Sequence, residues 1–536
     1  MEPGHPRLKK KRLPADRFVR PKYGFCVAHF FARKTHKMAN GETIESYVPA
    51  RLDALPWSSW HWLIVLSLGA TWILDGLEVT LAGALGGVLT RPETLGLTPA
   101  RVGASATSYL AGAVLGALLF GYGTDRFGRK KLFFITVAVY LIGTALSAFS
   151  WNFWSYAFFR AVTGAGIGGE YAAINSAIDE LIPARVRGRV DLIINGSYWV
   201  GAALGAAATL FLLDPGRIPI WLGWRLAFGI GAMLGLIVIF FRRWIPESPR
   251  WLMIHGRNPE AEQIVGEVER KITANRSNGV KEYWSSGAKQ MPGNHIITPS
   301  LQHSIAPIRV RTRTHTPWHE IWDAIVYEHR RRSFLGFVLM LTQAFFYNSI
   351  FFTYALVLMR FYSVPEQNVG SYLLPFALGN VLGPLLLGHL FDTIGRKPMI
   401  TITYGLAGIL LALTGWLFHA GVLTAQTQTL AWTMIFFIAS AAASSAYLTV
   451  SEIFPLEIRA LAIAIFYAIG TLAGGVGAPL LFGWIIGTGS VTALFIGYLV
   501  AAALMIFGAI VEAWIGVPAE RQSLEHVAAP LSSKGL

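Results

Sequence analysis

Residues 121–130 read GYGTDRFGRK, and residues 388–397 read GHLFDTIGRK. Both stretches keep the pattern G-x3-D-x2-G-R-K, and each lies between two long apolar runs. A second motif repeats with nearly the same offset: ELIPARVR begins at Glu180, and EIFPLEIR begins at Glu452. In both motifs, nearly the same number of residues separates the first copy from the second. This common spacing indicates that the chain consists of two homologous halves. Duplicated halves in a membrane are typical of secondary transporters, whose substrate site lies at the repeat interface.

The composition indicates that lipid is the solvent. Of the 536 residues, 54% are hydrophobic and 14% are charged, whereas soluble domains carry about 25% charged residues. The net charge of +15 could suggest nucleic-acid binding, but the basic residues fall in loops and in the N-terminal tail, and no nucleic-acid-binding module appears. The single cysteine, Cys26, excludes a disulfide framework and a cysteine-based metal site within the chain. We therefore expect a membrane protein with no nucleic-acid partner.

Twelve stretches are apolar enough and, at about 20 residues, long enough to span a bilayer. We expect them near 62–88, 102–122, 132–150, 153–178, 192–213, 225–243, 334–358, 369–390, 399–418, 430–450, 461–486 and 491–514. Lysine and arginine concentrate in alternate connections, at 123–131, 184–189, 242–333 and 396–397. This asymmetry predicts that these loops and both termini are cytoplasmic.

The spans divide the chain into five segments. We expect a cytoplasmic N-terminal tail at 1–61, a six-helix bundle at 62–243, a cytoplasmic central loop at 244–333, a second six-helix bundle at 334–514 and a cytoplasmic C-terminal tail at 515–536. The first apolar run begins near Trp62, too late for a cleaved leader. Residues 1–37 are basic and precede Met38, so our hypothesis is that Met38 is the natural start and that residues 1–37 are not native.

The central loop predicts two short helices. Residues 258–260 read NPE, a typical helix N-terminus, and apolar residues follow at helical spacing. A second helix should begin at Thr316-Pro317, on the membrane surface or under the bundle. Residues 274–315 between them are polar, which predicts disorder.

The chain resembles the major facilitator superfamily over residues 55–515. The copies at 121–130 and 388–397 match the loop signature of that superfamily, and RAVTGAG at 160–166 matches its fourth-helix motif. PESPRWL at 246–252 and the two ExxPxxxR motifs resemble the sugar-porter and related metabolite-symporter branch. The resemblance implies an all-α membrane protein with twelve transmembrane helices in two pseudo-symmetric six-helix bundles. It also implies a monomer, without a cofactor or metal.

The substrate motifs point to two classes of metabolite. In the expected seventh helix, TQAFFYN at 342–348 keeps Gln343 and Asn348 at the sugar-porter spacing, but Phe346 replaces a typical glycine. DGLE at 75–78 resembles the motif of aromatic- and organic-acid proton symporters. The resemblance therefore implies a small polar metabolite, either a sugar or an organic acid. Gln343 and Asn348 could hydrogen-bond this solute or, alternatively, join helices to each other.

Ionisable residues inside the spans suggest proton coupling. Asp75 and Glu78 lie one turn apart on one face of the first span, where a charged carboxylate costs about 2.5–3.5 kcal/mol. Arg160 in the fourth span is the candidate partner. Burial favours the protonated carboxyl and a nearby arginine favours the ionised one, so the carboxyl could gain and lose a proton. The alternative is a static ion pair. Glu170 is either a second protonation site or a packing group.

The repeated signatures predict conformational gating. Gly128 and Gly395 permit tight turns, and the charged residues can form pairs in one access state that break in the other. We expect Glu180 to pair with Arg187, and Glu452 with Arg459. The alternative is a solvated basic loop that only sets topology. The predicted gating residues are Gly121, Asp125, Arg126, Gly128, Arg129, Glu180, Arg187, Glu247, Arg250, Asp392, Gly395, Arg396, Glu452 and Arg459.

No enzymatic motif competes with this interpretation. The GxGxxG pattern at 164–169 lies inside an expected span, whereas a dinucleotide site needs a strand before it and a helix after it. We therefore expect no enzyme but a secondary active transporter that imports a small polar metabolite with protons. It would work across a bacterial-type cytoplasmic (inner) membrane by rocking-bundle alternating access. The alternatives are a uniporter or exporter of the same fold, and a non-transporting membrane sensor.

Overall fold

The computed structural model describes residues 41–277, 289–290, 296–297 and 307–534. Residues 38–536 form one compact unit. The hypothesis about a start at Met38 concerns residues outside the described ranges.

The described residues of the first half contain seven long helical segments. They are α2 (Ser59–Ala84), α3 (Pro99–Phe127), α4 (Arg129–Ala148), α5 (Phe153–Leu181), α6 (Arg187–Gly196), α7 (Tyr198–Leu212) and α8 (Ile220–Arg242). α6 and α7 are two parts of one span, which breaks at Ser197. The expected fifth span was continuous, and the structure corrects this prediction.

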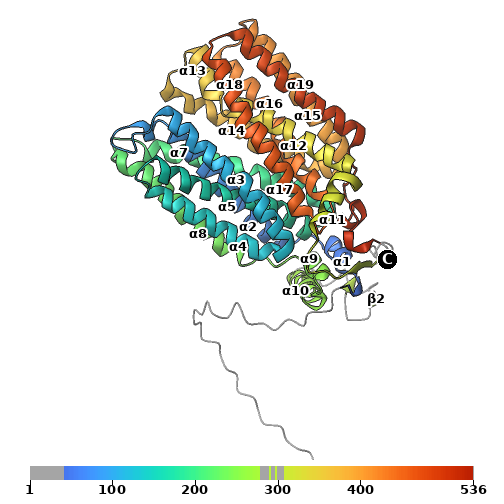
Figure 1. The fold of residues 1–536 in the computed structure, drawn as a ribbon. Coiled ribbons are helices and arrows are strands. Elements are labelled where there is room, and N and C mark those ends of the chain that lie inside the picture. Colours follow the sequence, from blue (N-terminus) through green and yellow to red (C-terminus); the bar gives the residue numbers. More distant parts are fainter. Residues whose placement is uncertain (1–40, 278–288, 291–295, 298–306, 535–536) are drawn as a thin grey trace, which may run out of the picture. The chain divides into compact units, whose positions relative to one another are not determined.

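The second half repeats the arrangement. Its helices are α12 (Arg330–Phe351), α13 (Tyr354–Tyr362), α14 (Glu366–Thr393), α15 (Arg396–His419), α16 (Ala425–Ile453), α17 (Arg459–Gly470), the π-helix η6 (Thr471–Gly477), α18 (Ala478–Gly487) and α19 (Val491–Ile515). Figure 1 shows α2 to α8, in blue and green, grouped apart from most of the later helices, with α17 beside α3.

Ten of the described helices are long and apolar enough to cross a membrane. The remaining two spans are α5, which carries Arg160, Glu170 and Glu180, and the broken α6–α7 pair. The charged residues of α5 and the break at Ser197 between α6 and α7 explain why length and composition alone do not identify these two spans. The prediction of twelve transmembrane helices in two six-helix bundles is confirmed.

Glycines allow the closest approach between helices. α3 and α5 pack against each other along most of their length. A Cβ atom at Gly164 would overlap the carbonyl oxygen of Tyr109, and one at Gly168 would overlap that of Ala113. The GxGxxG pattern at 164–169 therefore serves helix packing, as small residues do in membranes.

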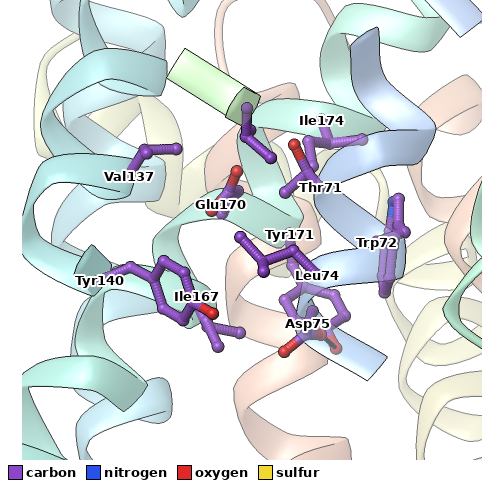
Figure 2. Close-up of a pocket in the computed structure, with 11 residues that line it drawn as sticks. Thr71, Trp72, Leu74, Asp75, Val137, Tyr140, Ile167, Glu170, Tyr171 and Ile174 are labelled. Carbon is purple, nitrogen blue, oxygen red and sulfur yellow. Dashed lines mark hydrogen bonds between the residues drawn. The ribbon is translucent and has the colours of Figure 1, made fainter. Parts of the chain in front are cut away.

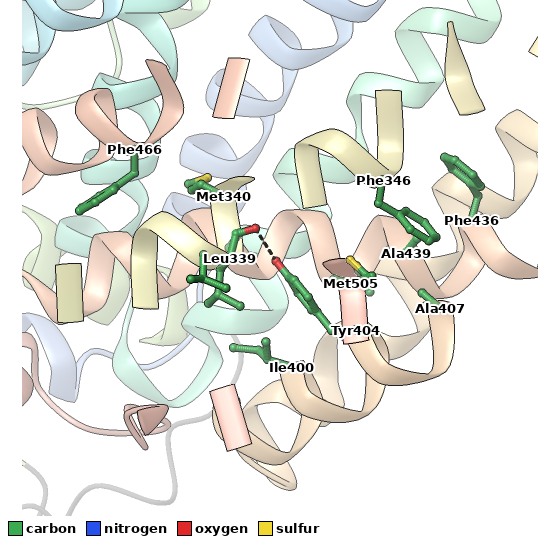
Figure 3. Close-up of a cluster of buried hydrophobic side chains, with 14 of the residues drawn as sticks. Leu339, Met340, Phe346, Ile400, Tyr404, Ala407, Phe436, Ala439, Phe466 and Met505 are labelled. Atoms are coloured by element: carbon green, nitrogen blue, oxygen red, sulfur yellow. Dashed lines mark hydrogen bonds between the residues drawn. The ribbon is translucent and has the colours of Figure 1, made fainter. Parts of the chain in front are cut away.

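An apolar core holds the second half together. Figure 3 shows Tyr404 reaching across this core, where its hydroxyl donates to the carbonyl oxygen of Leu339 at 3.2 Å. Phe346 is fully buried there and stacks on Phe436. The residue that replaces a typical sugar-porter glycine thus packs into the core.

Short elements cover the end of the bundles that carries the repeated signatures. They are α1 (Val48–Ala54), η3 (Ala184–Val186), α9 (Pro249–Ile254), α10 (Asn258–Ser277), α11 (Trp318–Trp322), the π-helix η5 (Asp323–Glu328), α20 (Leu524–Val527) and η7 (Leu531–Ser533). The opposite end carries η2 (Val88–Thr90). α10 and α11 are the two short helices expected in the central loop.

Two small strand pairs involve the central segment. β1 (Thr43–Ser46) of the N-terminal segment pairs antiparallel with β4 (Ile308–Arg311), and β2 (Lys289–Gln290) pairs with β3 (Ile296–Ile297). The prediction of disorder is therefore wrong for residues 308–311, because β1 hydrogen-bonds to them, and for residues 274–277, which belong to α10. It is also wrong for the short strands β2 and β3. Residues 278–288, 291–295 and 298–306 lie outside the described ranges.

Candidate functional site

A central cavity of about 1120 Å³, including its open part, lies between the two halves. Side chains from α2, α3, α5, α6 and α7 line it on one side, and side chains from α12, α16, α17 and η6 line it on the other. Lining residues from both halves and an open side are what a small-molecule site at the repeat interface requires.

Aromatic rings dominate the lining. They are Trp72, Tyr109, Tyr171, Tyr198, Trp199, Tyr347, Phe351, Phe352, Tyr447 and Tyr467. Amides and hydroxyls supply the other polar groups: Asn195, Gln343, Asn348, Ser440, Ser444 and Thr471. Among the described residues, no Asp, Glu, Lys or Arg side chain lines this cavity. The cavity can therefore pack against a ring and hydrogen-bond its edges, without a fixed charge.

Both predicted substrate residues reach the cavity. Gln343 and Asn348 line it from α12, and the Gln343 amide donates only a long hydrogen bond of 3.4 Å to the carbonyl oxygen of Met340. The sequence reasoning missed Asn195, which lines the cavity from the first half. An asparagine inside a membrane span is uncommon, so the residue type could have marked this position. The sequence does not show, however, which side of the helix faces the cavity.

Asp75 lies behind the aromatic lining. It is buried, and its Oδ2 accepts a hydrogen bond of 2.6 Å from the hydroxyl of Tyr171. The Tyr171 ring stacks on Tyr467 of the second half, with ring centroids 4.7 Å apart, and meets the edge of Trp72 at 4.4 Å. One tyrosine therefore connects the buried acid both to the cavity and to the opposite half.

Arg160 pairs with Glu78 and not with Asp75, so the expected partner is confirmed for one of the two acids. Its guanidinium also lies 4.6 Å from the centre of the Tyr109 ring. Positions 75 and 78 share one face of α2, but they differ enough in direction to meet different neighbours. Glu78 is therefore held by a cation, whereas Asp75 is held by a neutral donor.

A second pocket of about 340 Å³ adjoins Asp75 inside the first half. Figure 2 shows Asp75 beside Tyr171, and Glu170 nearer to Thr71. Glu170 pairs with Arg242 of α8, whose guanidinium also donates to the Thr71 hydroxyl at 2.8 Å. Two carboxyl groups, of Asp75 and Glu170, thus border the same pocket.

Each half caps a helix of the other half with an aspartate from its signature. Asp125 accepts hydrogen bonds from the backbone N–H groups of Ala460 (3.3 Å) and Leu461 (2.9 Å) at the start of α17. Asp392 accepts them equivalently at the start of α6, from the N–H groups of residues 188 (3.0 Å) and 189 (2.8 Å). A carboxylate at a helix N-terminus satisfies free donors and the helix dipole.

Arginine–glutamate pairs complete this cluster. Arg129 pairs with Glu180 at 2.6 Å, and Arg396 pairs with Glu452 at 2.9 Å, each within its own half. Two further pairs cross between the halves at 3.5 Å: Arg187 with Glu452, and Arg459 with Glu180. We call the eight residues the latch: Asp125, Arg129, Glu180, Arg187, Asp392, Arg396, Glu452 and Arg459.

The predicted pairing inside each ExxPxxxR motif is therefore wrong. In each motif the proline follows the end of one helix, and the arginine begins the next helix at the interface between the halves. Each arginine therefore pairs with the glutamate of the other half's motif. Arg126 is also misassigned, because it lies exposed outside the latch and donates to the Tyr122 hydroxyl at 3.3 Å.

The remaining predicted gating residues surround the latch. Glu247 accepts from the backbone N–H of Arg129 at 2.8 Å, and burial raises the pKa of this carboxyl. Arg250 pairs with Asp53 of α1 at 2.9 Å and with Glu525 of α20 at 2.8 Å. Residues beside the latch thus form ion pairs with α1 in the N-terminal segment and with α20 in the C-terminal segment.

The signature glycines have distinct geometric roles. Gly128 and Gly395 have φ angles of +98° and +118°, which side-chain-bearing residues rarely adopt. A Cβ atom at Gly121 would lie 2.6 Å from that of Ala464 in α17. The loops therefore turn tightly, and α3 approaches the other half closely.

Comparisons with known proteins identify the family. The family described as "Sugar (and other) transporter" matches residues 24–529. The niacin transporter NiaP of Acinetobacter baylyi is 26% identical over 433 residues, covering 80% of this chain and 88% of that protein. Myo-inositol transporter 2 of Schizosaccharomyces pombe is 28% identical over 436 residues, covering 75% and 70%.

Solved structures share the fold. A structure of XylE, a major facilitator superfamily proton:xylose symporter, bound to 6-bromo-6-deoxy-D-glucose, superposes with a TM-score of 0.69 at 20% identity. The match covers 88% of this chain and 98% of that one. XylE is from E. coli.

Proposed function

The chain belongs to the sugar (and other) transporter family of the major facilitator superfamily, and from this premise we propose that it is a proton symporter for a small polar ring compound. It is a multi-pass membrane transporter, not an enzyme. The observation that carries the proposal is the position of Asp75, one hydrogen bond behind the wall of the central cavity.

Coupling would pass through Tyr171. Its hydroxyl holds Asp75, while its ring stacks on Tyr467 of the opposite half. When the halves tilt, the stack and the hydrogen bond change together, so the proton affinity of Asp75 follows the access state. Glu78 and Arg160 fix the neighbouring turn of α2, and Glu170 borders the same pocket as Asp75. One proton falling through 100 mV yields about 2.3 kcal/mol, enough for roughly fifty-fold accumulation.

The cavity favours a neutral, polyhydroxylated ring as the solute. Aromatic faces pack against sugar and polyol rings, and Gln343, Asn348 and Asn195 offer amide donors and acceptors. A bare carboxylate would be buried without a cation among the lining residues, which is unfavourable. An organic acid is the second candidate, because a relative is named as a niacin transporter and because DGLE at 75–78 resembles acid symporters.

The latch would close the cytoplasmic side of the cavity. The basic loops lie at the latch end, so by charge asymmetry both termini would be cytoplasmic in an inner membrane. We propose that the two halves of one monomer rock about the cavity, surrounded by lipid. When the latch breaks, the cavity would open to the cytoplasm.

The function is tested with purified protein in liposomes. A thermal-shift screen of sugars, inositols, niacin and aromatic acids first identifies a ligand, since ligands that bind the folded state raise its melting temperature. Uptake of that ligand under a pH gradient and counterflow without a gradient are then measured.

Asp75→Asn is expected to abolish accumulation driven by the pH gradient and to spare counterflow. Full pH-driven accumulation in this variant would refute proton coupling through Asp75. Counterflow without a proton effect in the unmodified protein would indicate a uniporter. Binding without any exchange would indicate a sensor.

A further inference from the structure

Two aspartates lie beside the latch. Asp179 in α5 and Asp191 in α6 are both fully buried. No described residue donates a hydrogen bond of good geometry to any of their four carboxyl oxygens, although the Asn195 amide faces Asp191. The Ser451 hydroxyl, which faces Asp179, donates instead to the carbonyl oxygen of Leu448 at 2.9 Å.

The two aspartates occupy equivalent places on neighbouring antiparallel helices. One turn nearer the cavity, the Asn195 amide of α6 donates to the Asn175 amide oxygen of α5 at 3.2 Å. Asp179 follows Asn175 by four residues, and Asp191 precedes Asn195 by four, so both acids lie one turn toward the latch. Since Asn195 lines the cavity, the pair lies between the cavity and the latch.

The surrounding cations each pair with another carboxylate, although Nε of Arg187 and Nε and Nη1 of Arg459 have no hydrogen-bond partner among the described residues. Arg187 and Arg459 face Asp179, Arg396 faces Asp191, and Glu452 faces both. Arg187 pairs with Glu452 and Asp53, Arg459 with Glu180, and Arg396 with Glu452 and Asp392. On α3 and α4, which also pack on α5, Asp125 and Arg129 pair with each other, and Arg129 also pairs with Glu180.

Two further ionised carboxylates here would be buried without a hydrogen bond in the closed latch, beside arginines that already pair with other acids, and would repel Glu452, which is unfavourable. In the described parts of the chain, no group of three His, Cys, Asp or Glu side chains could hold a metal ion. The cation that fits each bare carboxylate is therefore a proton.

We propose that Asp179 and Asp191 form a second proton-binding site, which is occupied while the latch is closed and releases its protons when the latch opens. The inference rests on the proposed function only in assuming that the latch opens. Opening would admit water and separate both acids from Glu452, so the ionised forms would become favourable.

The direction in which pH shifts the equilibrium between the open and the closed latch follows from the number of protons that each state binds. The closed state binds more protons than the open state, so raising the pH favours opening. The open-to-closed ratio should rise by up to about tenfold per pH unit for each proton released. Deprotonation toward the cytoplasm would then help to open the latch on that side.

The test measures latch opening directly. Spin labels are placed at Arg126→Cys and Thr393→Cys, which are exposed positions beside the latch on opposite halves, in a Cys26→Ser, Asp75→Asn background without solute. The expected result is an open fraction that rises with pH. Adding Asp179→Asn and Asp191→Asn, which mimic the protonated acids, should hold the latch closed and remove the pH dependence.

The matched control is Asp214→Asn, at the opposite end of the first half, where the side chain is 40% exposed and pairs with Arg217. It should leave the pH dependence intact. An unchanged pH dependence in the double asparagine variant would overturn the proposal. Because no solute is added, this failure would leave the transport assignment standing, and a failed uptake assay would leave this proposal standing.

Infrared difference spectroscopy of the Asp75→Asn protein provides a second readout that needs no further substitution near the latch. Raising the pH should remove a protonated-carboxyl band as the latch opens. No change in that region of the spectrum would also overturn the proposal.

Discussion

At the residue scale, contacts through Tyr171 join Asp75, the proposed proton site, to Tyr467 of the opposite half. Glu78 is paired with Arg160, whereas among the described residues Asp75 is held by the hydroxyl of Tyr171 alone. We therefore propose that Glu78 supports the structure and that Asp75 supports coupling.

His255 provides a residue-scale prediction about pH and stability. Its ring stacks on Trp251 with centroids 4.0 Å apart, and burial lowers its pKa from 6.5 to about 4. The unfolded chain therefore binds this proton more readily than the folded protein. Stability should fall as the pH drops from 6.5 toward 4, with a contribution from His255 of up to about 3 kcal/mol.

The measurement is the melting temperature of the protein against pH. His255→Gln should flatten the decline between pH 6.5 and 4, whereas His315→Gln, at an exposed position, should leave it unchanged. An equal decline in both variants would contradict the assignment to His255.

Sequence reasoning located the ionisable residues but not their partners. It placed Asp75 and Glu78 on one face of one helix, yet only packing decides that Arg160 meets Glu78 and Tyr171 meets Asp75. Asp179 and Asp191 showed no repeated motif, so nothing in the sequence marked them. Their significance comes from the charges of other helices that surround them.

At the element scale, the latch consists of two equivalent sets of contacts, each of which joins a signature loop to a helix N-terminus in the other half. Repeated sequences predicted the equivalence. The exchange of arginine partners was not predictable, because it depends on how helices from different halves face each other.

Loss of either capping aspartate should loosen the latch. Asp125→Asn and Asp392→Asn each remove a charged cap, typically worth about 1 kcal/mol, or roughly fivefold in the open-to-closed ratio. Spin-label distances between residues 126 and 393 would report this change. The exposed Asp323→Asn serves as the control. Unequal or absent effects of the two aspartates would contradict their equivalence.

Close helix packing gives a second element-scale prediction. Gly164→Ala would place a methyl group against the carbonyl oxygen of Tyr109 and force α3 and α5 apart, with an expected loss of about 1–3 kcal/mol. Gly229→Ala in α8 meets no atom within 4 Å and should be tolerated. The measurement is the melting temperature of each variant. An equal drop in melting temperature in both variants would contradict close packing at Gly164.

At the scale of the whole molecule, two six-helix halves border a cavity that is lined by helices of both. The sequence predicted the halves because the duplicated signatures survive in it. It could not predict the break at Ser197 or the π-helix η6, since helix distortions respond to tertiary packing. The covering role of residues 520–533 was also unforeseen, because their contacts lie with distant segments, such as Glu457 with Ser532 at 2.9 Å.

The central claim is that transport requires the two halves to separate at the latch. A cross-link tests this most directly. A Cβ atom at Gly388 would lie 3.5 Å from the Cβ atom of Leu192 in the other half, so cysteines at positions 388 and 192 can form a disulfide. The pair is introduced in a Cys26→Ser background, and uptake of the ligand found by thermal shift is measured before and after oxidation. The account predicts that oxidation abolishes uptake, that reduction restores it, and that the oxidised protein still binds the ligand. Undiminished uptake by fully cross-linked protein would contradict it.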